Sequence, residues 1–182
     1  EVERRHVHLV YDAIAPAFHK TRYKPWPKVA VFLQGLPPGA LVADVGCGNG
    51  RYLECAPHVA FVALDRSLPL LHLAADRPSV PGCLAAACAL DVPLRSSTFD
   101  AAISIAVLHH IASPERRRRA VAELLRVVKV GGRVLVYAWA IDQAAGSRFH
   151  FSDADTLVPW TLGAAGSNDS KDSDGGGGIG GG

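Results

Sequence analysis

The chain has 182 residues, which is room for one domain of ordinary size and excludes two full domains. Hydrophobic residues make up 49% of it and charged residues 20%, so the composition supports a packed core and excludes wholesale disorder. The formal net charge is +2, with the basic excess in the body of the chain and the acidic excess after Phe151, and this balance does not define a partner.

Apolar runs predict five strands, each bounded by turn-forming residues. They lie at residues 40–45, 59–64, 82–87, 99–106 and 133–140. Two glycines at 131–132 are predicted as the turn before the fifth strand. Because helical patterns fill the intervals between these runs, the order is typical of a parallel sheet covered by helices on both faces.

Three helices are predicted within this alternation, after an amphipathic opening segment. One begins at Arg51, and a second covers residues 68–76. The third runs over residues 114–128, because Ser113 suits the cap position and a proline and a glutamate follow it in the first turn. From about Ala164 the composition changes to Gly, Ser, Asp and Asn, which predicts a disordered tail.

Apolar length and cysteine spacing give further expectations. No apolar run approaches the roughly 18 residues that cross a bilayer, and the opening segment lacks the order of a signal peptide. We therefore expect no membrane partner and a cytoplasmic location, possible also in the nucleus. The four cysteines match neither a zinc pattern nor a disulfide framework and are interpreted as free thiols. Since the sequence contains no methionine, we expect a fragment or a processed product.

The strongest local signal is a strand that runs into three closely spaced glycines, Gly46, Gly48 and Gly50. Glycines at the carboxyl end of a parallel strand let the backbone approach a ligand closely. A dinucleotide fingerprint would place its third glycine where Arg51 stands, and this counts against NAD. Asp65 closes the second strand and Asp91 follows the third, where carboxylates can accept ribose hydroxyls and an adenine amino group. The pattern suits a nucleoside without phosphates; the alternative is a tight turn beside two solvated acids.

This pattern resembles the class I S-adenosyl-L-methionine-dependent methyltransferases, whose acidic residue before the glycine loop corresponds to Asp44. The resemblance implies an α/β, Rossmann-like class I methyltransferase sheet with S-adenosyl-L-methionine as its cofactor. It also implies further cofactor contacts, from Asn49, Arg66, Val92 and Ala106. Complete members have seven strands, so we expect this chain to lack the last two. Residues 1–163 would then form an incomplete methyltransferase domain, followed by the tail at residues 164–182.

A narrower resemblance rests on the segments HVHLVYDAIAPAF, TRYKPWP, LDRS, SIAVLHHIASPERRRRAV, GGRVLVYAWA and LVPW. Together they are similar to the eukaryotic tRNA wobble-uridine 5-carboxymethyl methyltransferases, from about Val7 to Trp160. This similarity implies methyl transfer to the carboxylate of a 5-carboxymethyl group on the anticodon wobble uridine. It also implies two partners, the tRNA anticodon loop and a small zinc-binding activator subunit, and no metal in the chain itself.

The implied reaction asks mainly for placement, because a carboxylic acid with a pKa near ~4 is already ionised at neutral pH. Arg22 could hold one carboxylate oxygen, and Tyr23 or Trp26 could stack on the uridine. His109 and His110 follow the fourth strand, where they would orient the acceptor. Two alternatives stay open. Trp26 could belong to a rigid helix start that covers the core, and one histidine could be structural, because alternation along a strand points neighbours in opposite directions.

Two other functions also stay open. A non-catalytic relative would bind tRNA or a partner, and it would be recognised by cofactor binding without methyl transfer. A small-molecule methyltransferase of the same fold would need a large apolar lid, and Arg22 with the basic body counts against it. The arginine run at residues 116–119 covers successive helix faces, so part of it is expected to be solvated and part to be available to phosphates.

Overall fold

The computed structural model describes residues 1–21, 24–77, 82–140 and 156. The first compact unit is Glu1–Trp139, and it carries the sheet. The second unit, Ala140–Gly182, lies almost wholly outside the described residues. The predicted domain boundary after residue 163 and the predicted tail at residues 164–182 fall in that part and stay predictions.

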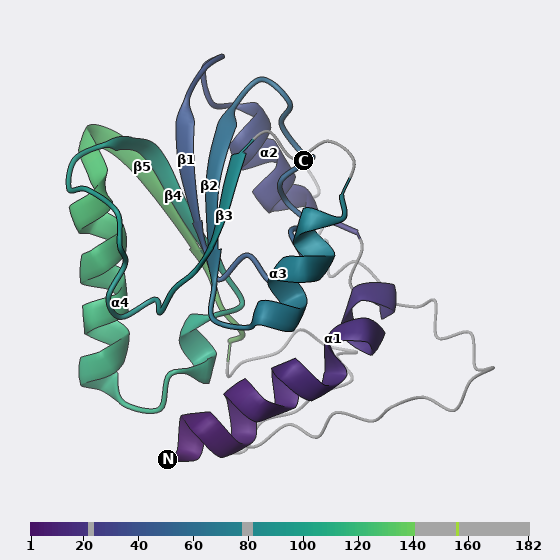
Figure 1. Ribbon diagram of the computed structural model, residues 1–182. Coiled ribbons are helices and arrows are strands. Elements are labelled where there is room, and N and C mark those ends of the chain that lie inside the picture. The colour runs from purple at the N-terminus through teal and green to yellow at the C-terminus, as the bar shows by residue number, and fades with distance from the viewer. Residues whose placement is uncertain (22–23, 78–81, 141–155, 157–182) are drawn as a thin grey trace, which may run out of the picture. The chain divides into compact units, whose positions relative to one another are not determined.

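Five parallel strands form a single sheet in the order β3-β2-β1-β4-β5 (Figure 1). They are β1 (Leu41–Val45), β2 (Ala60–Asp65), β3 (Gly82–Ala86), β4 (Phe99–Ile105) and β5 (Val128–Tyr137). This confirms the predicted parallel α/β sheet. The strand order reverses between β1 and β4, and ligands of open parallel sheets bind outside the carboxyl ends of strands at such a point.

The helices lie on both faces of the sheet, as predicted. They are α1 (Leu9–Thr21), α2 (Pro27–Gln34), α3 (Leu68–Ala75) and α4 (Pro114–Val127), with the short turns η1 (Arg4–His8) and η2 (Leu108–His110). Figure 1 shows α4 on one side of the sheet and α2 and α3 on the other. α4 begins as expected, because the Ser113 hydroxyl accepts the Arg116 backbone N–H at 3.3 Å.

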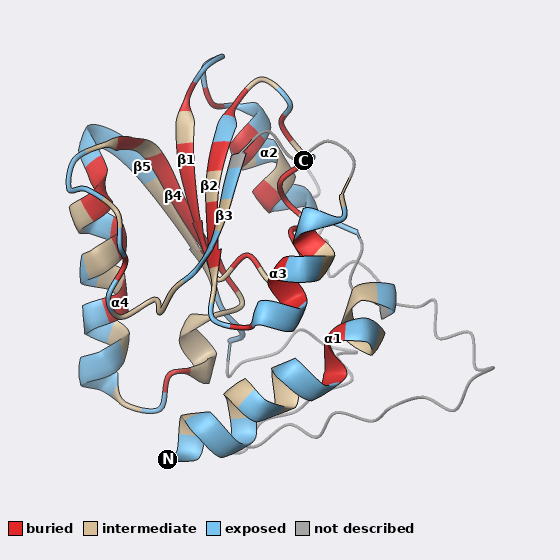
Figure 2. Cartoon of the chain, in the orientation of Figure 1, coloured by how far each residue is buried: buried red, intermediate tan, exposed pale blue. Residues whose placement is uncertain are grey.

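Two apolar clusters hold these layers together, one on each face of the sheet. On one face, Val29 and Leu33 of α2 pack with Phe61 of β2. On the other, Leu124 and Val127 of α4 pack with strand side chains that include Phe99. Figure 2 shows the buried residues following the strands and the inner sides of the helices. The apolar runs of the strands are therefore explained by burial on both faces.

The helix predicted from Arg51 does not form. Leu53 N donates to Gly50 O and Cys55 N to Tyr52 O, at 3.1 and 3.0 Å, so this segment consists of successive turns. Tyr52 and Leu53 are both buried although they are neighbours in sequence. The turns place both side chains in the apolar cluster on one face of the sheet.

The fifth strand begins at Val128, five residues earlier than predicted. Val128 pairs with Phe99, and regular pairing resumes with Arg133 opposite Ala101 after an irregularity. Gly131, with φ +82°, lies in this irregular part. The two glycines therefore interrupt the pairing inside the strand and do not precede it.

Among residues 1–21, 24–77 and 82–140, no helix combines the length and the apolar character needed to cross a membrane.

Candidate functional site

The glycine loop folds back against the end of β2. Gly46 N and Cys47 N both donate to Leu64 O, at 2.7 and 2.9 Å. Gly46 has φ +89°, and a Cβ at this position would overlap Cγ2 of Val107. A glycine is therefore required here both by the backbone conformation and by the close approach of the residue after β4.

Asp65 joins the glycine loop to the start of α3. Its Oδ2 accepts the Gly48 N–H at 2.7 Å, and its Oδ1 accepts the Ser67 N–H at 2.8 Å. Burial raises the pKa of Asp65, and these backbone N–H groups oppose the rise. Each carboxylate oxygen keeps a lone pair, so Asp65 can still accept hydroxyl donors from a ligand.

Asp44 lies one residue before the end of β1 and is almost completely buried, with 1% of its surface exposed. Neither of its carboxylate oxygens has a hydrogen-bond partner in the described part of the chain. Burial, and then the nearby charge of Asp65, raise the pKa of Asp44 to about 8. A buried acid without a partner is costly. A cationic or N–H-donating ligand group would satisfy it.

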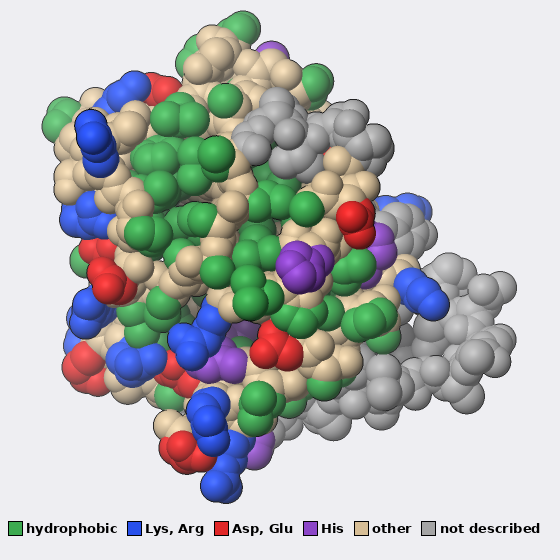
Figure 3. Space-filling view, viewed as in Figure 1, with side chains coloured by type: hydrophobic (Ala, Val, Ile, Leu, Met, Phe, Trp, Pro, Cys, Tyr) green, Lys and Arg blue, Asp and Glu red, His purple; other side chains and the backbone are tan. Residues whose placement is uncertain are grey.

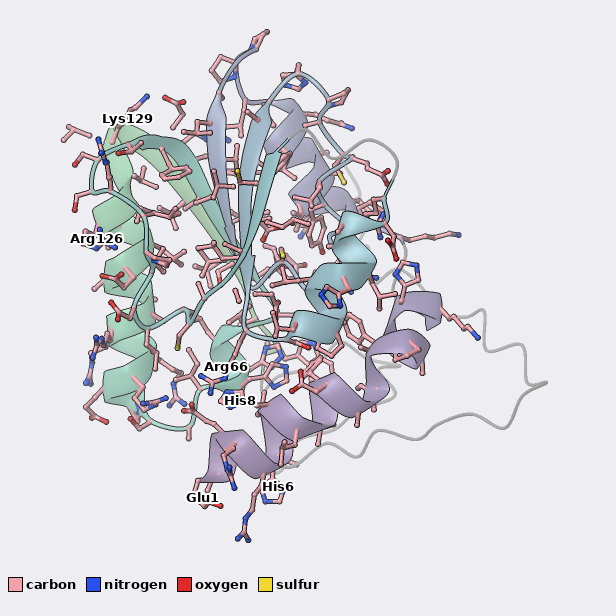
Figure 4. The ribbon with its side chains drawn as sticks, in the orientation of Figure 1. Glu1, His6, His8, Arg66, Arg126 and Lys129 are labelled. Carbon is pink, nitrogen blue, oxygen red and sulfur yellow. The ribbon has the colours of Figure 1, made fainter. Side chains whose placement is uncertain are left out.

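Three other residues predicted to bind the cofactor lie at the same edge of the sheet. Asn49 is buried, with its Nδ2 3.3 Å from Nδ1 of His19. Arg66 is exposed, and Figure 4 shows it beside His8, whose pKa is lowered by burial and then by the Arg66 charge. Ala106 follows β4 directly and has a left-handed conformation, with φ +60°. Such strain in a residue other than glycine is frequent at functional sites.

Asp91 and Val92, the last two predicted cofactor residues, are held toward α4. Val92 N donates to Glu123 Oε2 at 2.8 Å, and Val92 O accepts from Arg126 at 2.8 Å. Asp91 is exposed. The pKa of Arg126 is raised by its hydrogen bond to Glu123 and, more weakly, by the charge of Asp91. The described contacts do not join Asp91 to Asp65, and its adenine-binding role stays a prediction.

The two histidines lie together in η2. Their ring centroids are 4.2 Å apart in an edge-to-face arrangement. The expectation that they point in opposite directions was wrong, because they occupy a 3₁₀ turn and not a strand. Burial lowers the pKa of both to about 4, and His109 adds to the shift of His110. Both rings are therefore neutral at pH 7.

Polar side chains of the N-terminal helical segment contact this edge, and these were not predicted. The Tyr11 hydroxyl lies 2.9 Å from Nε2 of His110, and Asp12 accepts the Ser67 hydroxyl at 2.6 Å. Glu3 accepts from Arg116 at 2.6 Å. The sequence holds a signal for this face, because Asp12 and His19 are seven residues apart and so share one side of a helix.

Of the predicted acceptor residues at the start of the chain, Trp26 is described, whereas Arg22 and Tyr23 lie outside the described residues. Trp26 precedes α2 in an extended conformation. It packs against the core, with its ring 5.0 Å from that of Tyr137. This packing fits the alternative of a core-covering helix start, and the substrate-stacking role of Trp26 stays a prediction.

Figure 3 shows basic and acidic side chains interspersed over the side of the molecule that carries α4. Arg116 pairs with Glu3, Arg117 donates to Ile111 O at 2.7 Å, and Arg118 lies 3.5 Å from Glu115. Arg118 and Arg119 are exposed, which confirms the expected solvated part of the run. The internal contacts of Arg116 and Arg117 were not predicted, and the availability of the run to phosphates stays a prediction. The four cysteines are free thiols, as predicted. The described residues contain no group of three or more His, Cys, Asp or Glu side chains that could hold a metal ion.

Comparison with known proteins defines the class. A family described as a methyltransferase domain matches residues 43–136, more than half of the chain. The complex of the Haloferax volcanii Trm112 methyltransferase activator with a methyltransferase contains a similar fold. It is 20% identical, with a TM-score of 0.59 over 69% of this chain and 58% of that one. The fold and the glycine loop are those of a class I methyltransferase, which uses S-adenosyl-L-methionine. The unpartnered carboxylate of Asp44 fits the amino group of this cofactor.

Curated relatives narrow the class. An Arabidopsis thaliana tRNA (carboxymethyluridine(34)-5-O)-methyltransferase is 46% identical over 88% of this chain and 37% of its own length. The Schizosaccharomyces pombe enzyme of the same name is 43% identical over 89% of this chain and 70% of its own length. The chain belongs to the family of tRNA (carboxymethyluridine(34)-5-O)-methyltransferases. It spans little more than a third of the Arabidopsis relative.

Proposed function

We propose that the protein transfers a methyl group from S-adenosyl-L-methionine to the carboxylate of 5-carboxymethyluridine at position 34 of tRNA. The product would be the methyl ester. The observation that carries this proposal is the 43% identity to the S. pombe enzyme, which extends over 70% of that relative. The acids and glycines at the carboxyl ends of β1 and β2 support the cofactor part of the proposal.

Three groups of this chain would hold the cofactor. Asp44, once deprotonated, would accept from its amino group, and Asp65 would accept from the ribose hydroxyls. The backbone at Gly46 and Gly48 would line its path, because these residues carry no side chain there. The bound cofactor would supply a methyl group already activated by the sulfonium charge.

The acceptor side requires orientation more than proton transfer. A carboxylate is ionised at neutral pH and needs no general base. His109 and His110, whose pKa values lie near 4, are weak bases that stay neutral while the reaction proceeds. Each neutral ring carries one N–H, which can donate to a carboxylate oxygen. The histidines would therefore hold the acceptor, and Arg22 would add the charge that selects a carboxylate.

The proposed partners are the tRNA anticodon loop and a small zinc-binding activator subunit. The α4 arginines not occupied by internal pairs would be available to phosphates. A methyltransferase of the same fold is found with the Trm112 activator, which supports the second partner in kind. A cytoplasmic location, or a nuclear one, would give access to tRNA.

The test is a methyl-transfer assay with the full-length protein and its activator on tRNA that carries 5-carboxymethyluridine. Labelled methyl should enter the tRNA and be released by mild alkali, because the product is an ester. The same tRNA without the carboxymethyl group is the control and should stay unlabelled. Cofactor binding without any transfer would contradict the proposal and favour the non-catalytic alternative.

A further inference from the structure

The contact between Tyr11 and His110 joins the N-terminal helix to the acceptor side of the site. The Tyr11 hydroxyl lies 2.9 Å from Nε2 of His110, and the two rings meet edge to face with centroids 5.2 Å apart. Phe18, two turns further along α1, contacts the same tyrosine ring at 5.6 Å. Contacts with two aromatic rings, those of His110 and Phe18, therefore hold the tyrosine ring in place.

Which group donates in this hydrogen bond depends on which ring nitrogen of His110 carries the proton. A phenol is a good donor to the lone pair of a neutral imidazole nitrogen and a weaker acceptor. The favoured arrangement has the Tyr11 hydroxyl donating to Nε2, which leaves the His110 proton on Nδ1. Among the described residues, the hydrogen bond of the His110 ring uses Nε2 and not Nδ1, so an N–H at Nδ1 can donate to a ligand.

His109 is oriented by Trp139, two residues after the end of β5. The backbone N–H of Trp139 lies 3.4 Å from Nδ1 of His109, and the two rings are tilted by 30° with centroids 5.4 Å apart. This contact uses Nδ1 of His109 as the acceptor and places the proton on Nε2. The rings of His109 and His110, whose centroids are 4.2 Å apart, therefore accept hydrogen bonds at different nitrogens, Nδ1 and Nε2 respectively. Each ring keeps one N–H.

We infer that Tyr11 is a positioning residue for methyl transfer: its hydroxyl fixes His110 as the Nδ1–H tautomer and so presents a neutral N–H donor to the acceptor carboxylate. This inference rests on the proposed function for the identity of the acceptor. It assigns to α1 a part in the chemistry beyond covering the edge of the sheet. A neutral donor suits this task, because it orients one carboxylate oxygen without protonating it, and the other oxygen stays free to attack.

The variant that tests this inference is Tyr11→Phe, which keeps the ring and its packing and removes only the hydroxyl. In nitrogen NMR spectra of the full chain at pH 7, wild-type His110 should show a protonated Nδ1 and an unprotonated Nε2. In Tyr11→Phe the Nε2–H form should gain population. The methyl-transfer kcat should fall about threefold to tenfold, as expected for one lost hydrogen bond. Cofactor affinity should stay unchanged.

The matched control is Asp12→Asn, which weakens the neighbouring contact of α1 to Ser67. It should leave the His110 tautomer as in the wild type. An Nε2–H tautomer in the wild type, or a wild-type tautomer in Tyr11→Phe, would overturn the inference. If the wild-type protein transfers no methyl group, the proposed function fails, yet the tautomer spectra still decide the role of Tyr11.

Discussion

At the carboxyl ends of β1 and β2 the site is built from segments close in sequence, whereas at the end of β4 it depends on a helix near the start of the chain. The Gly48–Asp65 hydrogen bond spans 17 residues, and the Tyr11–His110 hydrogen bond spans 99. The first region is fixed once two neighbouring strands pair. The second is completed only when α1 packs across the sheet edge.

The two regions also differ in the direction in which burial shifts the pKa values of their side chains. Burial raises the pKa of Asp44 and Asp65 in the first region, so these acids resist ionisation. In the second region burial lowers the pKa of both histidines, so these bases resist protonation. At pH 7 Asp44 and both histidines are thus favoured in their uncharged forms, and a cationic ligand would favour ionisation of Asp44.

The largest expected effect comes from a substitution in the first region, at the close approach between Gly46 and Val107. Gly46→Ala should lower the free energy of unfolding by about 2–5 kcal/mol, because a left-handed conformation and an overlap with Val107 act together. Gly39→Ala is the matched control, since Gly39 has φ +80° but, among the described residues, no atom beyond its chain neighbours lies within 4 Å of a Cβ. It should lose only about 1–2 kcal/mol in urea unfolding. Equal losses would show that the overlap is relieved by movement of Val107.

The next prediction uses the pH dependence of the free energy of unfolding to detect the ionisation of Asp44. A folded pKa of about 8 against an ordinary value of 3.8 means that the unfolded state releases the proton first. The free energy of unfolding should therefore fall as the pH rises from about 4 to 8, by at most ~1.4 kcal/mol per pH unit. The histidines act in the opposite direction, but only between about 4 and 6.5.

Unfolding measured at pH 6.5 and pH 8 without cofactor therefore reports mainly on the acids. Asp44→Asn should reduce the loss of stability between these two pH values, because the amide does not ionise. A loss as steep in Asp44→Asn as in the wild type would assign the effect to another group, of which Asp65 is the first candidate.

A third prediction compares Asp65 and Asp91, which the sequence analysis both assigned to cofactor binding. Asp65→Ala should weaken S-adenosyl-L-methionine binding tenfold or more, because it removes an acceptor of ribose hydroxyls and the support of Gly48. Asp91→Ala should weaken it about threefold, since Asp91 is exposed and solvent screens its contacts. Calorimetric titration of both variants measures the difference. The reverse order would place the main nucleoside contact after β3.

The smallest expected effect concerns the attachment of α1. Glu3→Gln weakens the ion pair with Arg116 and the hydrogen bond from Ala112 N. It should lower the free energy of unfolding by about 1 kcal/mol or less. Its control is Glu115→Gln, whose pair with Arg118 is exposed on both sides and should contribute almost nothing. Amide exchange should become faster along α1 in Glu3→Gln only. Unchanged exchange would mean that Tyr11, Asp12 and their neighbours suffice to hold the helix.

The sequence by itself determined the parallel sheet, four of its strands nearly to the residue, the Ser113 cap, and Gly46 and Asp65 as parts of one loop region. These follow from local signals, namely apolar runs, a capping side chain, and glycines at a strand end. It also predicted a helix at Arg51 and a later start of β5, because local patterns do not reveal that Tyr52 and Leu53 share the core or that Val128 pairs with Phe99.

Only the tertiary structure decided three features of the site. It left both oxygens of Asp44 without a partner among the described residues, brought the two histidines into ring contact, and placed Tyr11 against His110. Each depends on burial or on contact between segments distant in sequence, and these are set by how the layers pack and not by the preferences of a short stretch of chain. The chemistry of the acceptor side therefore becomes visible only when α1 lies across the sheet edge.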